Sequence, residues 1–464
     1  MSVAITLGLG LLTTLASAAS ATALVWAGFF RTHFLVITYL LVYFVFSQNT
    51  FGATEVFVSI YNRGGGMLFF SWLTWTLWAL GGLALARDKL LGAKTAPCAM
   101  RPWIFGFVVL FLVHAAVGFA LGLPAKDAFS GQGLIHIANM GLLALLLLRT
   151  VSTRKALELL VTAALVVIAA RALFGLVRYF FFGGDPVNPY DIRQYAPGAK
   201  LTFFDINDSL IACIGAAYCG YRLLHEKLSR LEKQLYVALI LVAVAVIVLS
   251  LRRTAWGGMA LASALVVALA PAGKRVAVGV PMAGFLAAGL AMLMVKRLSV
   301  AWEHAGVGWS ALYYDLVGGA HYGQASLRAL ELKLGWEAYL ASPIFGQGPW
   351  GRFEGYSGFG ESWHGGEGAF GFVHSGVLHV LFKSGLVGFV LLCGLLASFV
   401  WSVKRVYPAL DSRARAVLVM GAAGVLFMLP DILFGTPFIQ VRTTQLLGFC
   451  MALPYIAYNV GRQA

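Results

Sequence analysis

About thirteen apolar stretches, most of them close to 20 residues long, dominate this 464-residue chain. A helix of that length spans the hydrocarbon core of a bilayer and satisfies its own backbone hydrogen bonds. The stretches lie near residues 3–29, 33–51, 66–86, 103–122, 133–149, 156–182, 205–224, 234–250, 254–270, 275–296, 374–401, 415–430 and 443–459. The first has no basic region before it and no clear cleavage site, which favours a span over a removed signal peptide.

Composition agrees with a membrane protein. With 60% hydrophobic and 11% charged residues, the chain cannot cover itself with a polar surface and must use lipid as its solvent. The sequence therefore predicts an all-α, polytopic membrane helix bundle of about 12–13 transmembrane helices. We divide it into N-terminal helices (1–150), central helices with an outer loop at 183–204 (151–296), a long loop (297–373) and C-terminal helices (374–464).

Lysine and arginine residues predict the orientation of the bundle, since cytoplasmic loops carry the excess of both. In the thirteen-span arrangement the loops rich in these residues all fall on one side. They contain Arg87, Lys89, Lys94, Arg101, Arg149, Arg154, Lys155, Arg222, Lys227, Arg230, Lys233, Lys274, Arg275, Lys404, Arg405, Arg413 and Arg415. The net charge of +15 is then mostly topological and requires no nucleic-acid partner. This orientation predicts an outer N-terminus and a cytoplasmic C-terminus.

The longest polar stretch, residues 297–373, falls on the opposite, outer side. Loops of this length are usually functional. Residues 326–350 are typical of an amphipathic helix followed by a Pro/Gly turn, and "GFGESWHGGEGAFGF" follows with many glycines and aromatic rings. Such rings can stack on sugars, and a flexible linker is the alternative interpretation.

Six residues break the charge rule by lying at the outer boundary. They are His374 and the cations Arg178, Arg193, Lys200, Arg252 and Arg253. Guanidinium groups bind phosphate oxygens in a planar, bidentate way. The cluster therefore indicates a lipid-linked pyrophosphate just above the hydrocarbon. Contact between these cations and lipid headgroups is the alternative.

His374 lies where a glycine-rich loop enters the apolar stretch "GFVHSGVLHVLFKSGLVGF". At about 100° per residue, a helix begun at His374 places Gly385 and Gly388 beneath it, as close-approach positions for a neighbouring helix. The same geometry turns His379 and Lys383 away as a buried polar pair outside the site. Simple capping of the helix by His374 is the alternative.

A metal site is a further possibility, since His374 shares the outer side with other ligand-type residues. These are His304, His321, His364, Glu361 and Glu367. No His-x-x-x-His or Cys-x-x-Cys spacing supports it. We therefore expect no metal ion and no cofactor.

Several segments resemble the bacterial O-antigen ligase and O-antigen polymerase family over about residues 155–400. His374-Ser375, nine residues and Gly-Leu-Val-Gly at 385–388 are similar to that family's histidine motif, and "SPIFGQGPW" resembles the segment before it. "LSLRRTAWGG" is similar to its arginine-containing helix start, with Arg253 at the arginine position. "KLTFFDINDSLIA" resembles the segment before the central span, although Lys200 stands where arginine is expected. The family's usual twelve spans and cytoplasmic N-terminus also differ from the arrangement above.

The resemblance implies a glycan transferase of the bacterial inner membrane whose active site faces the periplasm. The donor is a glycan on undecaprenyl pyrophosphate, and the acceptor is a hydroxyl of a lipid A-core sugar. His374 is then the base that takes the hydroxyl proton, and Arg253 stabilises the leaving pyrophosphate. The other cations expected to bind the pyrophosphate are Arg178, Arg193, Lys200 and Arg252. One direct displacement would invert the anomeric carbon without a metal ion.

Other functions remain open on the same residues. An O-antigen or exopolysaccharide polymerase would use a second lipid-linked glycan as its acceptor, and a protein O-oligosaccharyltransferase would use a protein hydroxyl. A transporter would use Arg171 and Lys383 as charges within the membrane, and acidic partners for them would favour it.

Overall fold

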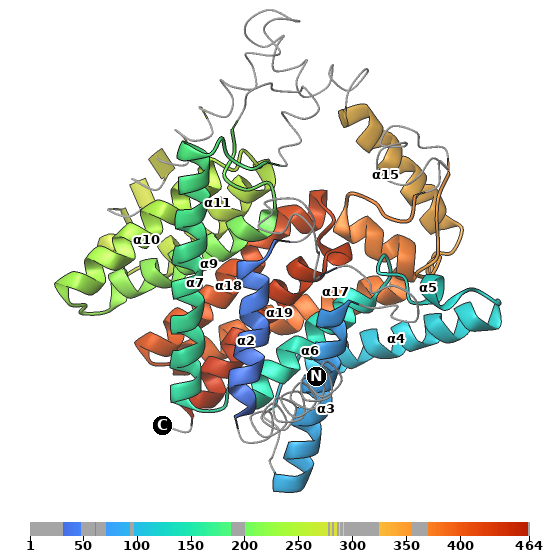
Figure 1. Ribbon diagram of the computed structural model, residues 1–464, viewed down its shortest axis with the longest axis horizontal. Helices are drawn as coiled ribbons and strands as arrows, with labels where there is room; N and C mark the ends of the chain where they lie inside the picture. The colour runs from blue at the N-terminus through green and yellow to red at the C-terminus, as the bar shows by residue number, and fades with distance from the viewer. Residues whose placement is uncertain are drawn as a thin grey trace, which may run out of the picture.

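The chain folds into helices throughout the part that the structure describes (Figure 1). The computed structural model describes residues 31–47, 61, 71–92, 97–186, 200–276, 279–280, 283–284, 287, 291, 324–354 and 370–462. Within these residues β pairing is limited to one isolated bridge between Phe353 and Phe370. The prediction of an all-α membrane bundle is confirmed.

The described residues form thirteen α-helices and three short 3₁₀ helices. The α-helices are α2 (Thr32–Val45), α3 (Trp72–Leu91), α4 (Arg101–Ala120), α5 (Ala125–Ala128), α6 (Ile135–Thr150), α7 (Arg154–Phe181), α9 (Ile206–His225), α10 (Arg230–Val248), α11 (Arg253–Leu269), α15 (Gln324–Leu340), α17 (Gly376–Val406), α18 (Ser412–Phe434) and α19 (Val441–Gly461). The 3₁₀ helices are η1 (Ala272–Lys274), η3 (Tyr407–Ala409) and η4 (Pro437–Ile439).

Five of these helices, α4, α7, α10, α17 and α18, are long and apolar enough to cross a membrane. The shorter apolar helices α2, α6 and α11 also fall on predicted spans, as do the more polar α3, α9 and α19. The chain is therefore a multi-pass membrane protein. The predicted span 3–29 lies outside the described residues, and so do most of 275–296 and most of the 297–373 loop. The outer position of the N-terminus therefore stays a prediction.

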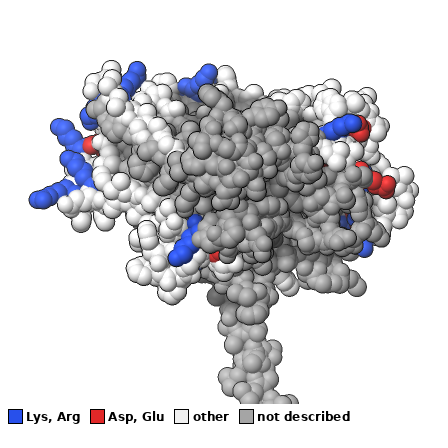
Figure 2. Space-filling model, turned by 90° about the horizontal axis from the view of Figure 1, so that it is seen from above, with Lys and Arg blue, Asp and Glu red and all other residues white. Residues whose placement is uncertain are grey.

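The more polar helices α9 and α19 are tolerated because they lie inside the bundle. α19 is buried along nearly its whole length, and it packs with α18 and α6. The outer helices α4, α7 and α10 instead turn large apolar side chains such as Phe105, Val166 and Leu241 outward. Figure 2 looks onto one end of the bundle, where much of the described surface in view carries neither acidic nor basic side chains.

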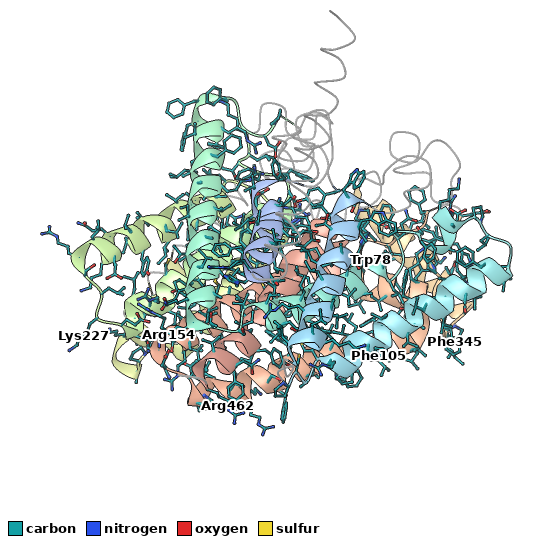
Figure 3. The ribbon with its side chains drawn as sticks, turned by 60° about the horizontal axis from the view of Figure 1, so that its bottom comes forward. Trp78, Phe105, Arg154, Lys227, Phe345 and Arg462 are labelled. Atoms are coloured by element: carbon teal, nitrogen blue, oxygen red, sulfur yellow. The ribbon has the colours of Figure 1, made fainter. Side chains whose placement is uncertain are left out.

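The basic residues gather at one end of the bundle. There Lys274 Nζ donates to the Leu224 carbonyl at 2.9 Å, and Arg413 lies 2.8 Å from Glu158. Figure 3 brings this end forward and labels Arg154, Lys227 and Arg462. The basic helix ends that the structure describes thus lie on one side of the bundle, as predicted. The opposite end holds the candidate site.

Candidate functional site

His374 lies immediately before α17 and not on it. The Ser375 hydroxyl accepts a hydrogen bond from the backbone N–H of Leu378 at 3.3 Å and caps the helix, which begins at Gly376. Helical periodicity does not extend back to His374. The prediction that His374 and Gly385 share one helix face is therefore wrong.

The ring of His374 is held by Glu331 of α15. Nδ1 lies 2.8 and 2.9 Å from the two Glu331 carboxylate oxygens, and the His374 backbone N–H donates to Oε1 at 2.8 Å. The Glu331 side chain is 1% exposed and the His374 side chain 20% exposed. A buried carboxylate in this position favours the proton on Nδ1 and leaves the lone pair of a neutral ring on Nε2. The arrangement provides an oriented proton acceptor.

Apolar packing fixes α15 against the chain that leads to His374. The buried members of this cluster are Phe353, Phe370, Val373, Leu378 and Phe382. Leu334 and Ala338 of α15 pack against them. A Cβ added to Gly335 would lie 2.7 Å from Cγ2 of Val373, so the α15 backbone directly contacts the residue before His374. Glu331 thus reaches His374 from a supported helix.

α17 is broken at Gly385, whose φ of 61° and ψ of −162° are non-helical. A break inside a membrane span frees backbone groups that lipid cannot satisfy. Residues 343–348 pair with them through Gln347 N to Phe382 O (2.8 Å), Gly348 N to Lys383 O (3.0 Å), Leu386 N to Pro343 O (2.8 Å) and Val387 N to Ile344 O (3.1 Å). The "SPIFGQG" segment is therefore hydrogen-bonded to the membrane helix on both sides of its break.

The two glycines of the histidine motif have different roles from those predicted. Gly385 supplies a left-handed φ that non-glycine residues rarely adopt, and its added Cβ would collide with the backbone of Ile344 and Gly346. Gly388 leaves room for the Ser384 side chain of its own helix. Neither glycine serves as a close-approach point for a neighbouring helix. Lys383 and His379 are buried as predicted, at 1% and 2% exposure.

The turn between α10 and α11 places the arginines Arg252 and Arg253. Leu251 has a φ of 55°, and within the described residues it is the one non-glycine residue with a positive φ. Such conformations are uncommon and gather at functional sites. Arg252 Nη1 donates to the Phe204 carbonyl at 2.5 Å, and Nη2 lies 3.9 Å from Asp431 Oδ1. Arg253 is exposed on the first turn of α11.

The end of α18 connects this turn to the start of α17. Asp431 there contacts Arg252, while the neighbouring Ile432 carbonyl would lie 2.8 Å from a Cβ added to Gly376. Both α11 and α17 therefore begin at the same end of α18. This contact brings the predicted arginines and His374 to one region of the molecule.

Arg178 is buried and paired within the protein. Its Nη2 donates to the Thr202 carbonyl and lies 3.3 Å from Asp185 Oδ2. Its guanidinium stacks 4.6 Å from the centroid of the Phe203 ring, and so does that of Arg171. Gly175, between the two arginines on α7, leaves room for that ring. Arg178 thus anchors the segment that leads into α9, and its binding of pyrophosphate stays a prediction.

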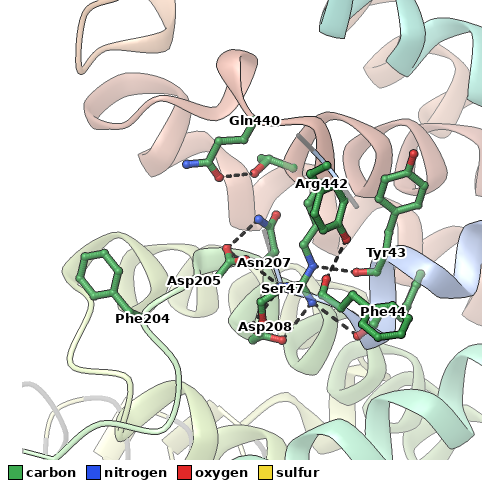
Figure 4. A network of polar contacts seen from close by, with 12 residues as sticks. Tyr43, Phe44, Ser47, Phe204, Asp205, Asn207, Asp208, Gln440 and Arg442 are labelled. Atoms are coloured by element: carbon green, nitrogen blue, oxygen red, sulfur yellow. Dashed lines mark hydrogen bonds and ion pairs between the residues drawn. The ribbon is translucent and has the colours of Figure 1, made fainter. Parts of the chain in front are cut away.

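A buried ion-pair network joins α7, α9 and α19 (Figure 4). Arg442 of α19 donates to Asp205 Oδ2 at 2.7 Å and to Asp208 Oδ1 at 3.0 Å. Arg171 of α7 donates to the same Asp208 oxygen at 2.8 Å and also contacts Ser47. Two arginines and two aspartates neutralise one another, which is what permits full burial of charge.

Sequence reasoning missed Asp205, Asp208 and Arg442. The rule that selected the outer cations, a charge at the outer end of a span, would have selected Arg442 as well.

Asp208 is an acidic partner for Arg171, which is what the transporter alternative requires of that arginine. Lys383 has none among the described residues, where its amine donates to the carbonyls of Pro349 and Gly351.

Of the remaining predicted binding residues, Lys200 lies within the described part of the chain and Arg193 does not. Lys200 is exposed at the start of the segment that precedes α9. Arg193 lies outside the described residues, as do the proposed metal ligands His304, His321, His364, Glu361 and Glu367. Within the part of the chain that the structure describes, no three His, Cys, Asp or Glu side chains group closely enough to hold a metal ion.

A family model described as O-Antigen ligase matches residues 237–393. The chain carries a domain of the O-antigen ligase family. No curated protein matches the chain. The O-antigen ligase match contains Arg252, Arg253, Glu331 and His374, as well as the break at Gly385. It falls within the region of resemblance read from the sequence and confirms the predicted resemblance to the O-antigen ligase and polymerase family over these residues.

Proposed function

We propose that this protein moves a glycan from undecaprenyl pyrophosphate to a hydroxyl of a lipid A-core sugar on the periplasmic face of the bacterial inner membrane. The observation that carries the proposal is the contact between His374 and Glu331 inside the O-antigen ligase match. A histidine oriented by a buried carboxylate is suited to general-base catalysis. The acceptor hydroxyl is the group that such a base would activate.

In the proposed reaction, the acceptor oxygen attacks the anomeric carbon of the donor glycan as its proton passes to Nε2 of His374. The bond between that carbon and the pyrophosphate oxygen breaks, and the electron pair leaves with the pyrophosphate. Glu331 stabilises the imidazolium that forms, as a carboxylate does in other base-orienting pairs. A single displacement inverts the anomeric carbon.

Arginines would stabilise the negative charge that develops on the leaving pyrophosphate. We assign the catalytic role to Arg253, because it is exposed beside the strained turn at Leu251. Arg252, Lys200 and Arg193 are proposed to bind the pyrophosphate, with Arg178 supporting the same region from its buried position. Since pyrophosphate is already a good leaving group, the proposed reaction needs no metal ion.

The periplasmic assignment follows from the distribution of charge. Basic residues gather at the end opposite to His374, and cytoplasmic loops carry the excess of Lys and Arg. The four sequence parts 1–150, 151–296, 297–373 and 374–464 are proposed as the organisation around this site. His374 and Arg253 are then on the side where a flipped lipid-linked glycan is exposed.

Deletion of the gene should separate ligase from polymerase. If the protein is a ligase, polymerised glycan remains on undecaprenyl pyrophosphate and the lipid A-core lacks it, because the transfer step is missing. The measurement is a glycan gel of extracted lipopolysaccharide together with the glycan released from the lipid carrier. Lipid A-core that carries one repeat unit would instead identify a polymerase, and normal lipopolysaccharide with altered glycoproteins would identify a protein O-oligosaccharyltransferase.

Glu331→Gln should lower kcat by ~10²–10⁴-fold and leave the KM for the donor unchanged, because the neutral amide no longer stabilises the imidazolium. The donor and the acceptor for this assay can both be extracted from the deletion strain. Glu337→Gln is the matched control, since Glu337 lies on the same helix with its side chain 54% exposed. Full activity of Glu331→Gln would remove the carboxylate from the mechanism.

A further inference from the structure

We propose that Lys383 is a positioning residue for His374. By holding residues 343–351 in the break of α17, its amine group fixes the geometry between His374 and Glu331. The inference rests on the proposed function, because it concerns the base of that reaction.

The contacts of Lys383 are unusual for a buried lysine. Its Nζ donates to the Pro349 carbonyl at 3.1 Å and to the Gly351 carbonyl at 2.6 Å, and its side chain is 1% exposed. Within the described residues it forms no ion pair with a carboxylate. Burying the amine of a lysine is costly, above all at membrane depth. Both carbonyls belong to residues 343–351, so the buried amine serves to hold that segment.

The first part of the segment 343–351 has little apolar burial, whereas Pro349 packs against Gly133 and Trp350 against His114. Ile344 and Phe345 are 60% and 56% exposed. Gly346 and Gly348 have left-handed φ angles of 73° and 76°, which suits a tight turn but adds no side-chain packing. Besides this packing and the contact of His114 Nε2 with the Phe345 carbonyl at 3.0 Å, the segment is held by its hydrogen bonds to the broken helix and by the two bonds from Lys383.

Both residues of the proposed catalytic pair, Glu331 and His374, are connected to this segment. On the side of Glu331, Gln347 Nε2 donates to the Ala338 carbonyl at the end of α15 at 2.9 Å. On the side of His374, Phe353 pairs with Phe370 through backbone hydrogen bonds of 3.0 and 2.9 Å, four residues before the histidine. A shift of the segment would move both partners. Misplacement of catalytic groups by about 1 Å can lower rates by ~10²-fold.

Lys383→Met keeps the apolar length of the side chain and removes the donor. We expect trypsin to cleave the purified protein after the exposed Arg352 roughly tenfold faster in this variant, because two buried hydrogen bonds to the segment are lost. Lys333→Met is the matched control, since the Lys333 side chain is 72% exposed on α15. An unchanged cleavage rate at Arg352 in Lys383→Met would overturn the proposal.

Kinetics then test whether the effect reaches His374. Lys383→Met should lower kcat by roughly tenfold at unchanged KM for the extracted lipid-linked donor. Combined with Glu331→Gln, it should lower kcat hardly further than Glu331→Gln alone, because both changes act through the same histidine. Losses that multiply would mean that Lys383 does not act through this pair and would overturn the positioning role.

A second variant covers the case in which Lys383→Met fails to fold. A Cβ at Gly346 would collide with the backbone of Lys383 and Ser384, so Gly346→Ala displaces the segment while leaving the lysine in place. It should reproduce both the faster cleavage and the loss of kcat. Gly82→Ala on α3 is its control, since a Cβ there meets no atom within 4 Å. Normal cleavage and kcat in Gly346→Ala would contradict the proposal.

The same experiments distinguish failure of this inference from failure of the proposed function. If Glu331→Gln and His374→Ala impair transfer while Lys383→Met and Gly346→Ala do not, only the positioning role falls. If His374→Ala is fully active, the proposed reaction falls and this inference falls with it.

Discussion

His374→Ala should lower glycan transfer by ~10²–10⁴-fold, the usual cost of removing a general base. The folded structure should persist, because the bond from the backbone N–H of residue 374 to Glu331 does not need the imidazole ring. The measurement is kcat with donor and acceptor from the deletion strain, together with the surface glycan of a strain that carries the variant gene.

His33→Ala is the matched control for this experiment, since His33 lines a crevice with Arg87 and Thr150 at the basic end of the bundle. It should transfer glycan at the normal rate. Normal surface glycan in His374→Ala, at a normal level of protein in the membrane, would rule out His374 as the base.

Arg253→Lys should fail almost as badly as Arg253→Ala, with a loss of ~10²–10³-fold in kcat for each. A guanidinium group presents parallel donors to two phosphate oxygens, whereas an ammonium group is a single point of charge. The measurement is kcat and KM for the lipid-linked donor in both variants.

Arg230→Lys is the control, because Arg230 is also exposed at the first position of a helix, but at the opposite end of the bundle. It should be active. If Lys restores full activity at position 253, positive charge alone is sufficient there and the bidentate contact with pyrophosphate is wrong.

The positions of the membrane helices could be predicted from the sequence because each apolar stretch is long enough to indicate a span by itself. The stretch near 156–182 became α7 (Arg154–Phe181), and the amphipathic pattern in 326–350 became α15 followed by a turn. The family resemblance and the boundary position of His374 came from local motifs. Each of these features depends on residues that are neighbours in the sequence.

The contacts between distant segments could not be predicted in this way. Glu331 precedes His374 by 43 residues, and no pattern links them. The spacing of Gly385 and Gly388 is typical of close helix packing, and helical periodicity gave no sign that Gly385 ends the regular helix. Its left-handed φ is favoured because residues 343–348 supply the missing hydrogen bonds, and that partner segment is identified only by the fold.

The network around Arg442 has a consequence for the order in which the protein assembles. Arg171 and Asp208 are 37 residues apart and can pair as soon as α7 and α9 are inserted, but Arg442 follows Asp208 by 234 residues. Until α19 is inserted, Arg171 is the one arginine of the network present with Asp205 and Asp208, so the network carries an excess of one negative charge. Insertion of α19 then neutralises that charge through Arg442. The last helix therefore gains an ion pair on insertion, which favours completion of the bundle.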